Sequence, residues 1–423
     1  MISKNKIVAI VLAASIVSVS VAAYFILKDD KAVFDEGLII DFGDYTGEWA
    51  SVSAFGMDGE SVIRDACEEK GYEVIFADGK VVSVNGISSV DRTWDLWTWT
   101  SESGWNKTDK PSSTILSDKV YASLALTSAG KEPVLPCVDA QGNNIFSVTD
   151  SRIVSLSPSV TDTLCMTGNM GGLIGTDSFS NYPGLPESVK KSWSYYDNIS
   201  PSTIVELDPK LVIGNVDDHG PLLNNIRESG IRSVSMYTAG TIEIIYQNTW
   251  MIGAVTGNID EANNTILKMK ATLEEIQAKS FAASGKTAVI LFGDPPSSGY
   301  GWQWAVGCDT FIFDALSKVG IVNLLDGPEW KPWIDDLSEV SAAGTPDIVI
   351  FISSSVVAPG EIKDAIWDNG LEEWPYLGAK GSSDVWKDVK IYLLDGEMGE
   401  VFMLPGPRIF DVLKEMVENV TPI

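Results

Sequence analysis

The chain of 423 residues is poor in metal-binding and redox side chains. It has one histidine, His219, and four widely spaced cysteines that form no Cys-x-x-Cys pair. A single imidazole excludes metal sites built on several histidines. A catalytic triad that needs a histidine could use only His219. The cysteine spacing excludes a zinc ribbon and a dense disulfide framework. His219 itself lies in the sequence VDDHG, where we expect a solvated loop residue.

Basic residues are also few. The chain has 30 Lys plus Arg against 58 Asp plus Glu, which gives a net charge of −28. A charge of this sign repels phosphate backbones and anionic lipid surfaces. We therefore exclude nucleic acid as a partner.

Sequence signatures of catalysis are missing as well. There is no Gly-x-Ser-x-Gly elbow. The residues SGKT at 284–287 resemble the end of a nucleotide-binding loop, but Ser280 stands where a glycine is required, and the order is helix then strand. Acidic pairs such as Asp335-Asp336 leave a glycosidase open by composition alone. The sequence thus favours a binding protein over an enzyme.

A long apolar run lies at the amino terminus. Lys4 and Lys6 precede 21 uncharged residues at positions 7–27, followed by KDDK. About 20 apolar residues span a bilayer, and the basic flank favours the cytoplasmic side. We predict that residues 1–32 are a single-pass membrane anchor, or alternatively a signal segment cleaved after Ser20-Val21-Ala22. In both cases the rest of the chain is extracellular.

Residues 33–147 have the pattern of a small β-rich α+β domain and its linker. A helix is predicted at 60–71, and strands at 73–77 and 80–87 are joined by Asp78-Gly79, a hairpin signal. Four tryptophans follow within a short segment, and they fit core packing and an exposed ligand platform equally well; they are Trp94, Trp97, Trp99 and Trp105.

From Arg152 onward strands alternate with helices, which predicts α/β architecture with parallel sheets. The pattern occurs twice: a strand ending in a Pro-containing loop, a short helix, and a second Pro-apolar strand. We predict two similar lobes, at 148–258 and 286–423. The segment 259–285 between them has apolar residues at steps of three and four, which indicates one long bridging helix; they are Ile266, Met269, Leu273 and Ile276.

The first lobe begins with RIVSLSPSVTDTLCMTGNMGGLIGTD, residues 152–177. A strand, a small-residue loop and a helix form the unit that places a ligand at the carboxyl edge of an open α/β sheet. With no nucleophile beside it, we expect this unit to be a cradle for a ligand.

These segments, together with LSEVSAAGTPDIVIF in the second half, resemble the cobalamin and iron-siderophore binding proteins of ABC importers, the helical-backbone class III. The resemblance covers about residues 150–420. It implies two lobes that are bridged by one long helix, hold a large chelate between them, and deliver it to a membrane permease. No covalent cofactor is implied.

The resemblance also implies site residues. The predicted ligand contacts are aromatic residues of both lobes: Phe179, Trp193, Tyr196, Tyr300, Trp302, Trp304 and Trp333. Permease docking in this family resembles a contact through one glutamate per lobe. Glu339 matches the second-lobe position, whereas Ser202 stands at the first, with Glu206 as the nearest acid.

The amino-terminal domain resembles the β-rich domain at the carboxyl end of transcobalamin and intrinsic factor. That domain covers one face of cobalamin, so we include Trp97 and Trp99 among the ligand contacts. The prediction is a membrane-anchored receptor that captures cobalamin or a related corrinoid. The alternatives are an iron-siderophore or haem receptor and a cell-surface adhesion or scaffold protein.

Overall fold

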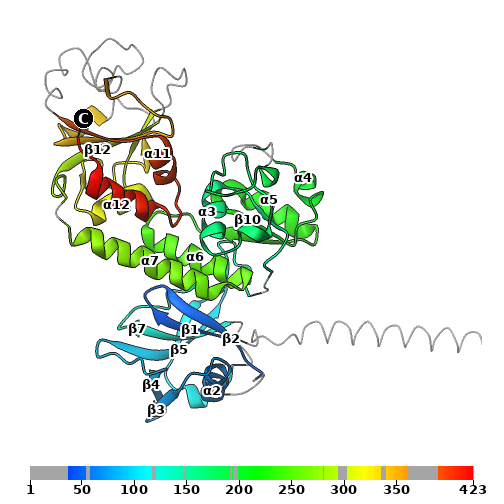
Figure 1. Ribbon diagram of the computed structural model, residues 1–423. Coiled ribbons are helices and arrows are strands. Elements are labelled where there is room, and N and C mark those ends of the chain that lie inside the picture. The colour runs from blue at the N-terminus through cyan, green and yellow to red at the C-terminus, as the bar shows by residue number, and fades with distance from the viewer. Residues whose placement is uncertain are drawn as a thin grey trace, which may run out of the picture. The chain divides into compact units, whose positions relative to one another are not determined.

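The structure is a computed structural model. It describes residues 37–53, 58–116, 121–146, 149–190, 193, 199–279, 281–293, 303–334, 340–360 and 389–422. The chain divides into two compact units, Met1–Cys137 and Val138–Ile423 (Figure 1). No helix among the described residues is long and apolar enough to span a membrane. The anchor predicted for residues 1–32 lies outside those residues.

The described residues of the first unit form one five-stranded sheet with the order β2-β1-β7-β5-β6, a two-stranded hairpin β3-β4, and one α-helix. Only β1 and β7 pair in parallel in that sheet. The elements are β1 (Gly37–Gly43), β2 (Thr46–Ser51), α2 (Gly59–Glu69), β3 (Val74–Ala77), β4 (Lys80–Val84), β5 (Arg92–Thr100), β6 (Gly104–Thr108), the 3-10 turn η1 (Pro111–Ser113) and β7 (Tyr121–Ser128).

The local signals of this unit act as expected. Asp58 caps α2 by accepting a hydrogen bond from the Ser61 amide at 3.0 Å. Asp78 and Gly79 both have positive φ, 52° and 74°, as a two-residue hairpin turn requires. The predicted helix and hairpin are confirmed.

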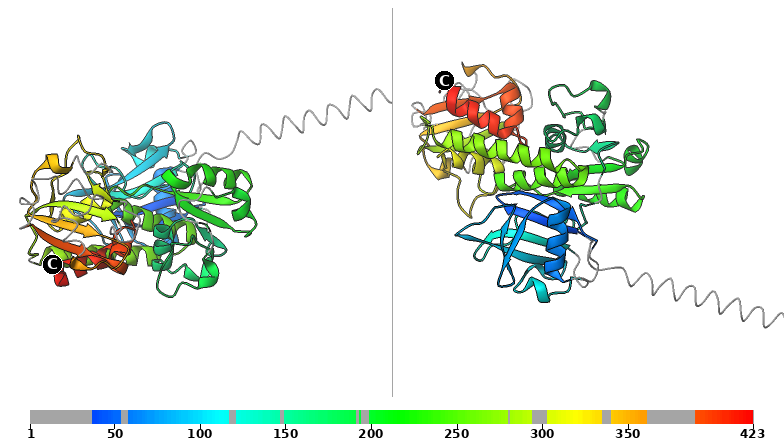
Figure 2. Two further views of the ribbon diagram at one scale, coloured as in Figure 1. Left: turned by 90° about the horizontal axis from the view of Figure 1, so that it is seen from above. Right: turned by 60° about the horizontal axis from the view of Figure 1, so that its bottom comes forward.

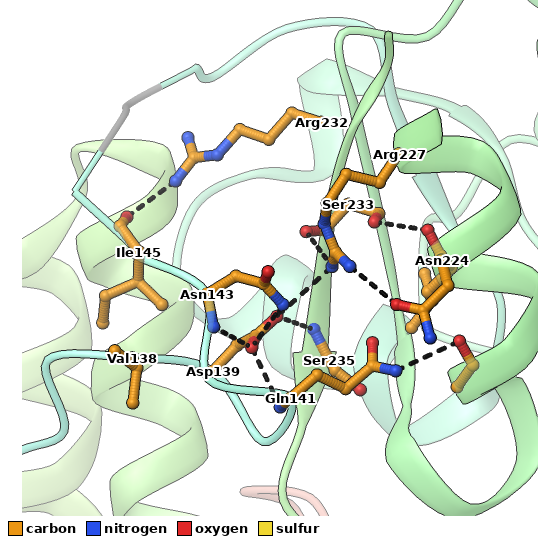
Figure 3. Close-up of polar contacts among 12 residues, drawn as sticks. Val138, Asp139, Gln141, Asn143, Ile145, Asn224, Arg227, Arg232, Ser233 and Ser235 are labelled. Carbon is orange, nitrogen blue, oxygen red and sulfur yellow. Dashed lines mark hydrogen bonds and ion pairs between the residues drawn. The ribbon is translucent and has the colours of Figure 1, made fainter. Parts of the chain in front are cut away.

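The second unit begins ten residues earlier than the boundary we expected between 147 and 148. Asp139 is 1% exposed, and its carboxylate accepts hydrogen bonds from the Asn143 amide at 2.8 Å and the Ser235 amide at 3.0 Å (Figure 3). Arg232 donates to the Ile145 carbonyl at 2.7 Å. Residues 138–145 are therefore fixed to the edge strand of the first lobe, and a reading of periodicity could not detect this polar attachment.

The first lobe has a four-stranded sheet with the order β11-β10-β8-β9, all in parallel, as predicted. Its elements are β8 (Ile153–Ser155), α3 (Pro158–Met166), η2 (Met170–Gly172), β9 (Leu173–Gly175), η3 (Glu187–Val189), α4 (Pro201–Val205), β10 (Leu211–Asn215), α5 (Val216–Glu228) and β11 (Arg232–Met236). Ser157 caps α3 and Pro158 occupies its first turn, so the segment folds as the strand, loop and helix expected.

Two described helices, α6 and α7, pack against both lobes, where the sequence predicted one. α7 (Ile259–Gln277) is the predicted bridging helix, and Ile266, Met269 and Ile276 are buried on it. α6 (Ile242–Thr256) packs along α7, and Figures 1 and 2 show the pair running from one lobe to the other. Most residues of α6 are buried, so apolar side chains occur on several sides of the helix and the amphipathic period that identified α7 is weak.

The second lobe has a mixed sheet, which corrects the prediction of two parallel sheets. Its order is β15-β13-β12-β16-β17, with β14 beside β12, and β13 runs antiparallel to both neighbours. The elements are β12 (Thr287–Gly293), β13 (Gln303–Val306), α8 (Phe311–Lys318), β14 (Val322–Asn323), β15 (Trp333–Ile334), η5 (Val340–Ala343), β16 (Ile348–Ile352), β17 (Lys390–Leu394), α11 (Gly396–Phe402) and α12 (Ile409–Asn419).

Candidate functional site

A turn after β9 carries the most exposed aromatic side chain among the described residues of the first lobe. Phe179 is 54% exposed, and its amide donates to Asp177 Oδ1 at 2.8 Å. A large exposed ring at the carboxyl end of a parallel strand is suited to ligand contact. We name residues 176–182 the Phe179 turn.

A chain of buried hydroxyl groups holds this turn from behind. Ser180 Oγ lies 2.5 Å from Asp177 Oδ2 and 2.7 Å from Thr161 Oγ1 on α3. Thr161 Oγ1 in turn donates to Ser155 Oγ at 2.8 Å, at the end of β8. The end of β8 and the first turn of α3 are therefore connected through hydrogen bonds to the turn that carries the exposed ring, and they position it.

The Asp177 carboxyl group is fully buried beneath the turn. Burial raises its pKa, while hydrogen bonds from Ser180 and the Phe179 amide oppose that shift. Both carboxyl oxygens are occupied by groups of the turn itself. Asp177 is thus a structural acceptor in this arrangement.

The second lobe reaches the same turn. Arg408, just before α12, forms an ion pair with Asp162 on α3, and its guanidinium lies 5.1 Å from the centre of the Tyr182 ring. Arg408 Nη2 also donates to the Asn181 carbonyl at 3.4 Å. Residues far apart in the sequence therefore meet at the Phe179 turn.

Three aromatic rings gather on the sheet of the second lobe. Phe292 lies opposite Trp304 across the β12-β13 pair, and the Trp333 ring centre lies 5.9 Å from that of Phe292 and 6.4 Å from that of Trp304. Trp304 and Trp333 are half-buried. The pairing of β13 with β15 thus unites two of the predicted ligand contacts.

Other predicted residues lie elsewhere. Trp193 is 8% exposed in the core of the first lobe, with Val154 and Leu223 in the same cluster. Glu206 is exposed at the end of α4, as a docking residue must be. Four further predictions, Tyr196, Tyr300, Trp302 and Glu339, lie outside the described residues.

The tryptophans of the first unit divide between two faces of its sheet. Trp94 packs in the core against α2, with Leu96. Alternation along β5 places Trp97 and Trp99 on the opposite face, where Trp97 is 8% exposed and Trp99 packs against Tyr121 at 5.6 Å between ring centres. Their role as ligand contacts remains a prediction.

His219 is buried in a helix, and Val356 is an exposed apolar residue that the sequence did not indicate. His219 is 3% exposed in the first turns of α5 and accepts a hydrogen bond from the Asn215 amide at 3.3 Å, so the expected solvated loop is wrong. Val356, after β16 in the second lobe, is 86% exposed and was not predicted. Its only sequence signal is an apolar pair within a Ser-rich loop.

No group of three or more His, Cys, Asp or Glu among the described side chains is arranged to hold a metal ion. What the described groups can do is contact a ligand through apolar rings on both lobes.

Residues 153–355 match the family model described as periplasmic binding protein. That segment, a little under half of the chain, is similar to this family of binding proteins. The resemblance deduced from the sequence is thus confirmed at the level of this family, and so is the prediction of a binding protein without enzymatic activity. The likeness of the first unit to the transcobalamin domain stays a prediction.

Two curated proteins are similar to this chain over much of their length. The chain is 22% identical over 276 residues to the "Uncharacterized ABC transporter substrate-binding lipoprotein YvrC" of Bacillus subtilis, covering 64% of this chain and 80% of that protein. It is 26% identical over 243 residues to a "Cobalamin-binding protein" of Halobacterium salinarum, covering 54% of this chain and 64% of that protein.

Solved structures of periplasmic binding proteins share the fold. They include the "periplasmic heme-binding protein RhuT" of Roseiflexus sp. RS-1, with a TM-score of 0.50, 19% identity, and coverage of 63% of this chain and 96% of that one. Vibrio cholerae HutB, a "periplasmic Heme binding protein", has the same score and identity and covers 63% and 98%. These likenesses extend to the fold alone.

Proposed function

We propose that the chain is the extracellular binding component of an ABC importer and captures cobalamin or a related corrinoid between its lobes. The observation that carries the proposal is that each lobe holds aromatic side chains suited to ligand contact: the exposed Phe179 on the first lobe, and the half-buried Trp304 and Trp333 on the second. Both lobes pack against the α6-α7 helix pair. Large aromatic side chains bury flat macrocycles well, each contributing on the order of a few kcal/mol.

The cations of the lobes favour a corrinoid over an anionic chelate. Ferric siderophores and haem propionates need cationic partners. Arg408 is paired with Asp162, and Arg152 donates to the carbonyls of Leu207 at 2.6 Å and Asp208 at 2.7 Å. Two arginines that an anionic ligand would use are thus engaged with protein groups.

The halobacterial relative supports the same ligand class, because its name is cobalamin-binding protein. We propose that residues 1–32 anchor the chain in the membrane and that the permease docks through Glu339 and Glu206. Trp97 and Trp99 of the first unit are proposed as further contacts to the corrinoid. An iron-siderophore or haem receptor is the second candidate, and the haem-binding proteins of the same fold favour it.

Co-elution tests the proposal. The full-length chain, purified in a mild detergent, is incubated separately with cyanocobalamin, hemin and ferrioxamine B, and is then desalted. We expect the visible spectrum of cyanocobalamin to elute with the protein at one ligand per chain. The double variant Trp304→Ala/Trp333→Ala should lose most of that signal.

Retention of hemin or ferrioxamine B in place of cyanocobalamin would transfer the proposal to the second candidate. Retention of none of the three ligands would favour the adhesion or scaffold alternative. Equal retention by the double variant would show that the ring cluster is not the site.

A further inference from the structure

Arg408 belongs to the second lobe by sequence, but its guanidinium contacts the first lobe. It pairs with Asp162 on α3, donates to the Asn181 carbonyl at 3.4 Å, and lies over the Tyr182 ring at 5.1 Å. A guanidinium is planar and multiply donating, so it can engage a carboxylate, a carbonyl and a ring face together. A lysine could not reproduce this set.

The pair is desolvated. The Arg408 side chain is 14% exposed, and that of Asp162 is 3% exposed. Burial raises the pKa of Asp162, and the charge of Arg408 opposes that shift. Removal of one partner therefore leaves an uncompensated charge next to the Phe179 turn.

Neighbouring groups of the second lobe contact the same segment. Glu400 on α11 accepts a hydrogen bond from Asn181 Nδ2 at 3.4 Å. A Cβ atom added at Gly406 would lie 2.9 Å from Asp162 Oδ2, so the loop before α12 must lack a side chain there. Residues 400–408 thus fit closely against α3 and the end of the Phe179 turn.

Separate contacts hold the lobes together at the helix pair. The rings of Tyr246 on α6 and Phe410 on α12 stack with 5.5 Å between centres. The Ile242 amide donates to Asp314 on α8 at 2.9 Å, and Lys318 pairs with Glu243 at 3.2 Å. The Arg408 contacts are therefore accompanied by other contacts that connect the lobes, of which the Asp314 and Lys318 contacts lie on α8 and not beside Arg408.

We propose that Arg408 is a positioning residue of the ligand site: an arginine of the second lobe that fixes the Phe179 turn of the first. The Phe179 turn of the first lobe then holds its position only while Arg408 of the second lobe contacts it. The positioning itself stands on the contacts above, whereas its effect on ligand affinity rests on the proposed function.

Hydrogen exchange measures the positioning without any ligand. In Arg408→Gln we expect the amides of residues 177–182 to exchange about tenfold faster than in the unaltered full-length chain, with β10 and α5 unchanged. A purely stabilising role would instead raise exchange across the whole second unit. Such a uniform rise, or no rise at the turn, would overturn the proposal.

Arg152→Gln is the matched control. Arg152 also donates to two backbone carbonyls and lies 3.4 Å from a carboxylate, that of Asp208, but all its contacts are within the first lobe. We expect its substitution to leave exchange at residues 177–182 unchanged. If Arg408→Gln does not fold, Asp162→Asn and Gly406→Ala disturb the same contact and should give the same local pattern.

Cyanocobalamin affinity supplies the second measurement. We expect Arg408→Gln to bind about tenfold more weakly, about 1.4 kcal/mol, chiefly through faster dissociation. Faster exchange at the turn with unaltered affinity would reject the coupling to ligand binding. If the unaltered chain binds no corrinoid, the proposed function fails, but the exchange experiment still decides the positioning role.

Discussion

At the scale of single residues, exposure separates ligand contacts from core side chains. Phe179 and Trp193 were predicted on the same grounds, yet one ring is 54% exposed and the other 8%. An exposed apolar ring adds little to folding stability, so its substitution should act on binding alone.

Phe179→Ala should weaken cyanocobalamin binding by about 1–3 kcal/mol and leave the melting temperature nearly unchanged, because the ring is removed from a surface rather than from a core. Titration calorimetry and a thermal melt measure the two quantities. Leu267→Ala is the control, since Leu267 on α7 is also 54% exposed but distant in sequence from the turn. A large melting shift without loss of affinity would assign Phe179 to packing.

A second residue-scale prediction concerns Asp41 on β1. Its buried carboxylate accepts hydrogen bonds from the amides of Gly43 at 2.8 Å, Val134 at 3.0 Å and Leu135 at 3.3 Å. Burial nevertheless raises its pKa to about 6 from the ordinary 3.8. The folded chain therefore binds this proton more tightly than the unfolded chain.

The stability that Asp41 contributes is thus complete below about pH 4 and is lost as the pH rises through 6. Between pH 4.5 and 7.5 we expect a loss of about 2 kcal/mol in the opening free energy of β1 amides, and Asp41→Asn should lack this loss. Hydrogen exchange at both pH values measures it. Asp91→Asn, at an exposed acid of the same unit, should behave like the unaltered chain.

At the scale of elements, the α6-α7 pair depends on close approach near its connecting turn. A Cβ atom added at Gly253 would lie 2.5 Å from Ala262 Cβ and 3.1 Å from the Asn258 carbonyl oxygen. Gly253→Ala should therefore destabilise the chain by about 1–3 kcal/mol, as overpacking does.

The control for that substitution is Gly220→Ala on α5, where the added Cβ meets only Gln141 Nε2 at 3.4 Å. Alanine is the better helix former, so this variant should be neutral or more stable by up to about 1 kcal/mol. Denaturant unfolding of both variants measures the difference. Equal stability of the two would mean that α6 and α7 can move apart at no cost.

Elements with a clear period or cap were predictable from the sequence. The stripe on α7, the Ser157 cap of α3 and the Asp78-Gly79 turn are local features, and each forms as expected. The antiparallel β13 and the buried α6 were not, because short apolar strands and all-apolar helices look alike in a sequence. At the site, the Arg408-Asp162 pair joins positions 246 apart, and no local signal indicates such a contact.

At the scale of the whole molecule, the net charge of −28 favours a basic partner at the membrane. Glu339→Ala should impair the uptake of a corrinoid into vesicles that contain the reconstituted permease, while the binding of the corrinoid by this chain stays unchanged. Glu206→Ala tests the first-lobe contact in the same assay, and Glu228→Ala, an exposed acid on α5, serves as the control. Equal loss of capture and transport would reject a docking role.

The Asp139 carboxylate described above has a practical consequence for producing the second unit alone. A fragment starting at residue 148 would lack the partner of Arg227, which lies 3.6 Å from Asp139 Oδ2, and of the Ser235 amide. Such a fragment should melt at a lower temperature and aggregate sooner than one starting at Val138. The useful cut site for expression is therefore set by one acidic side chain in the segment leading into the fold.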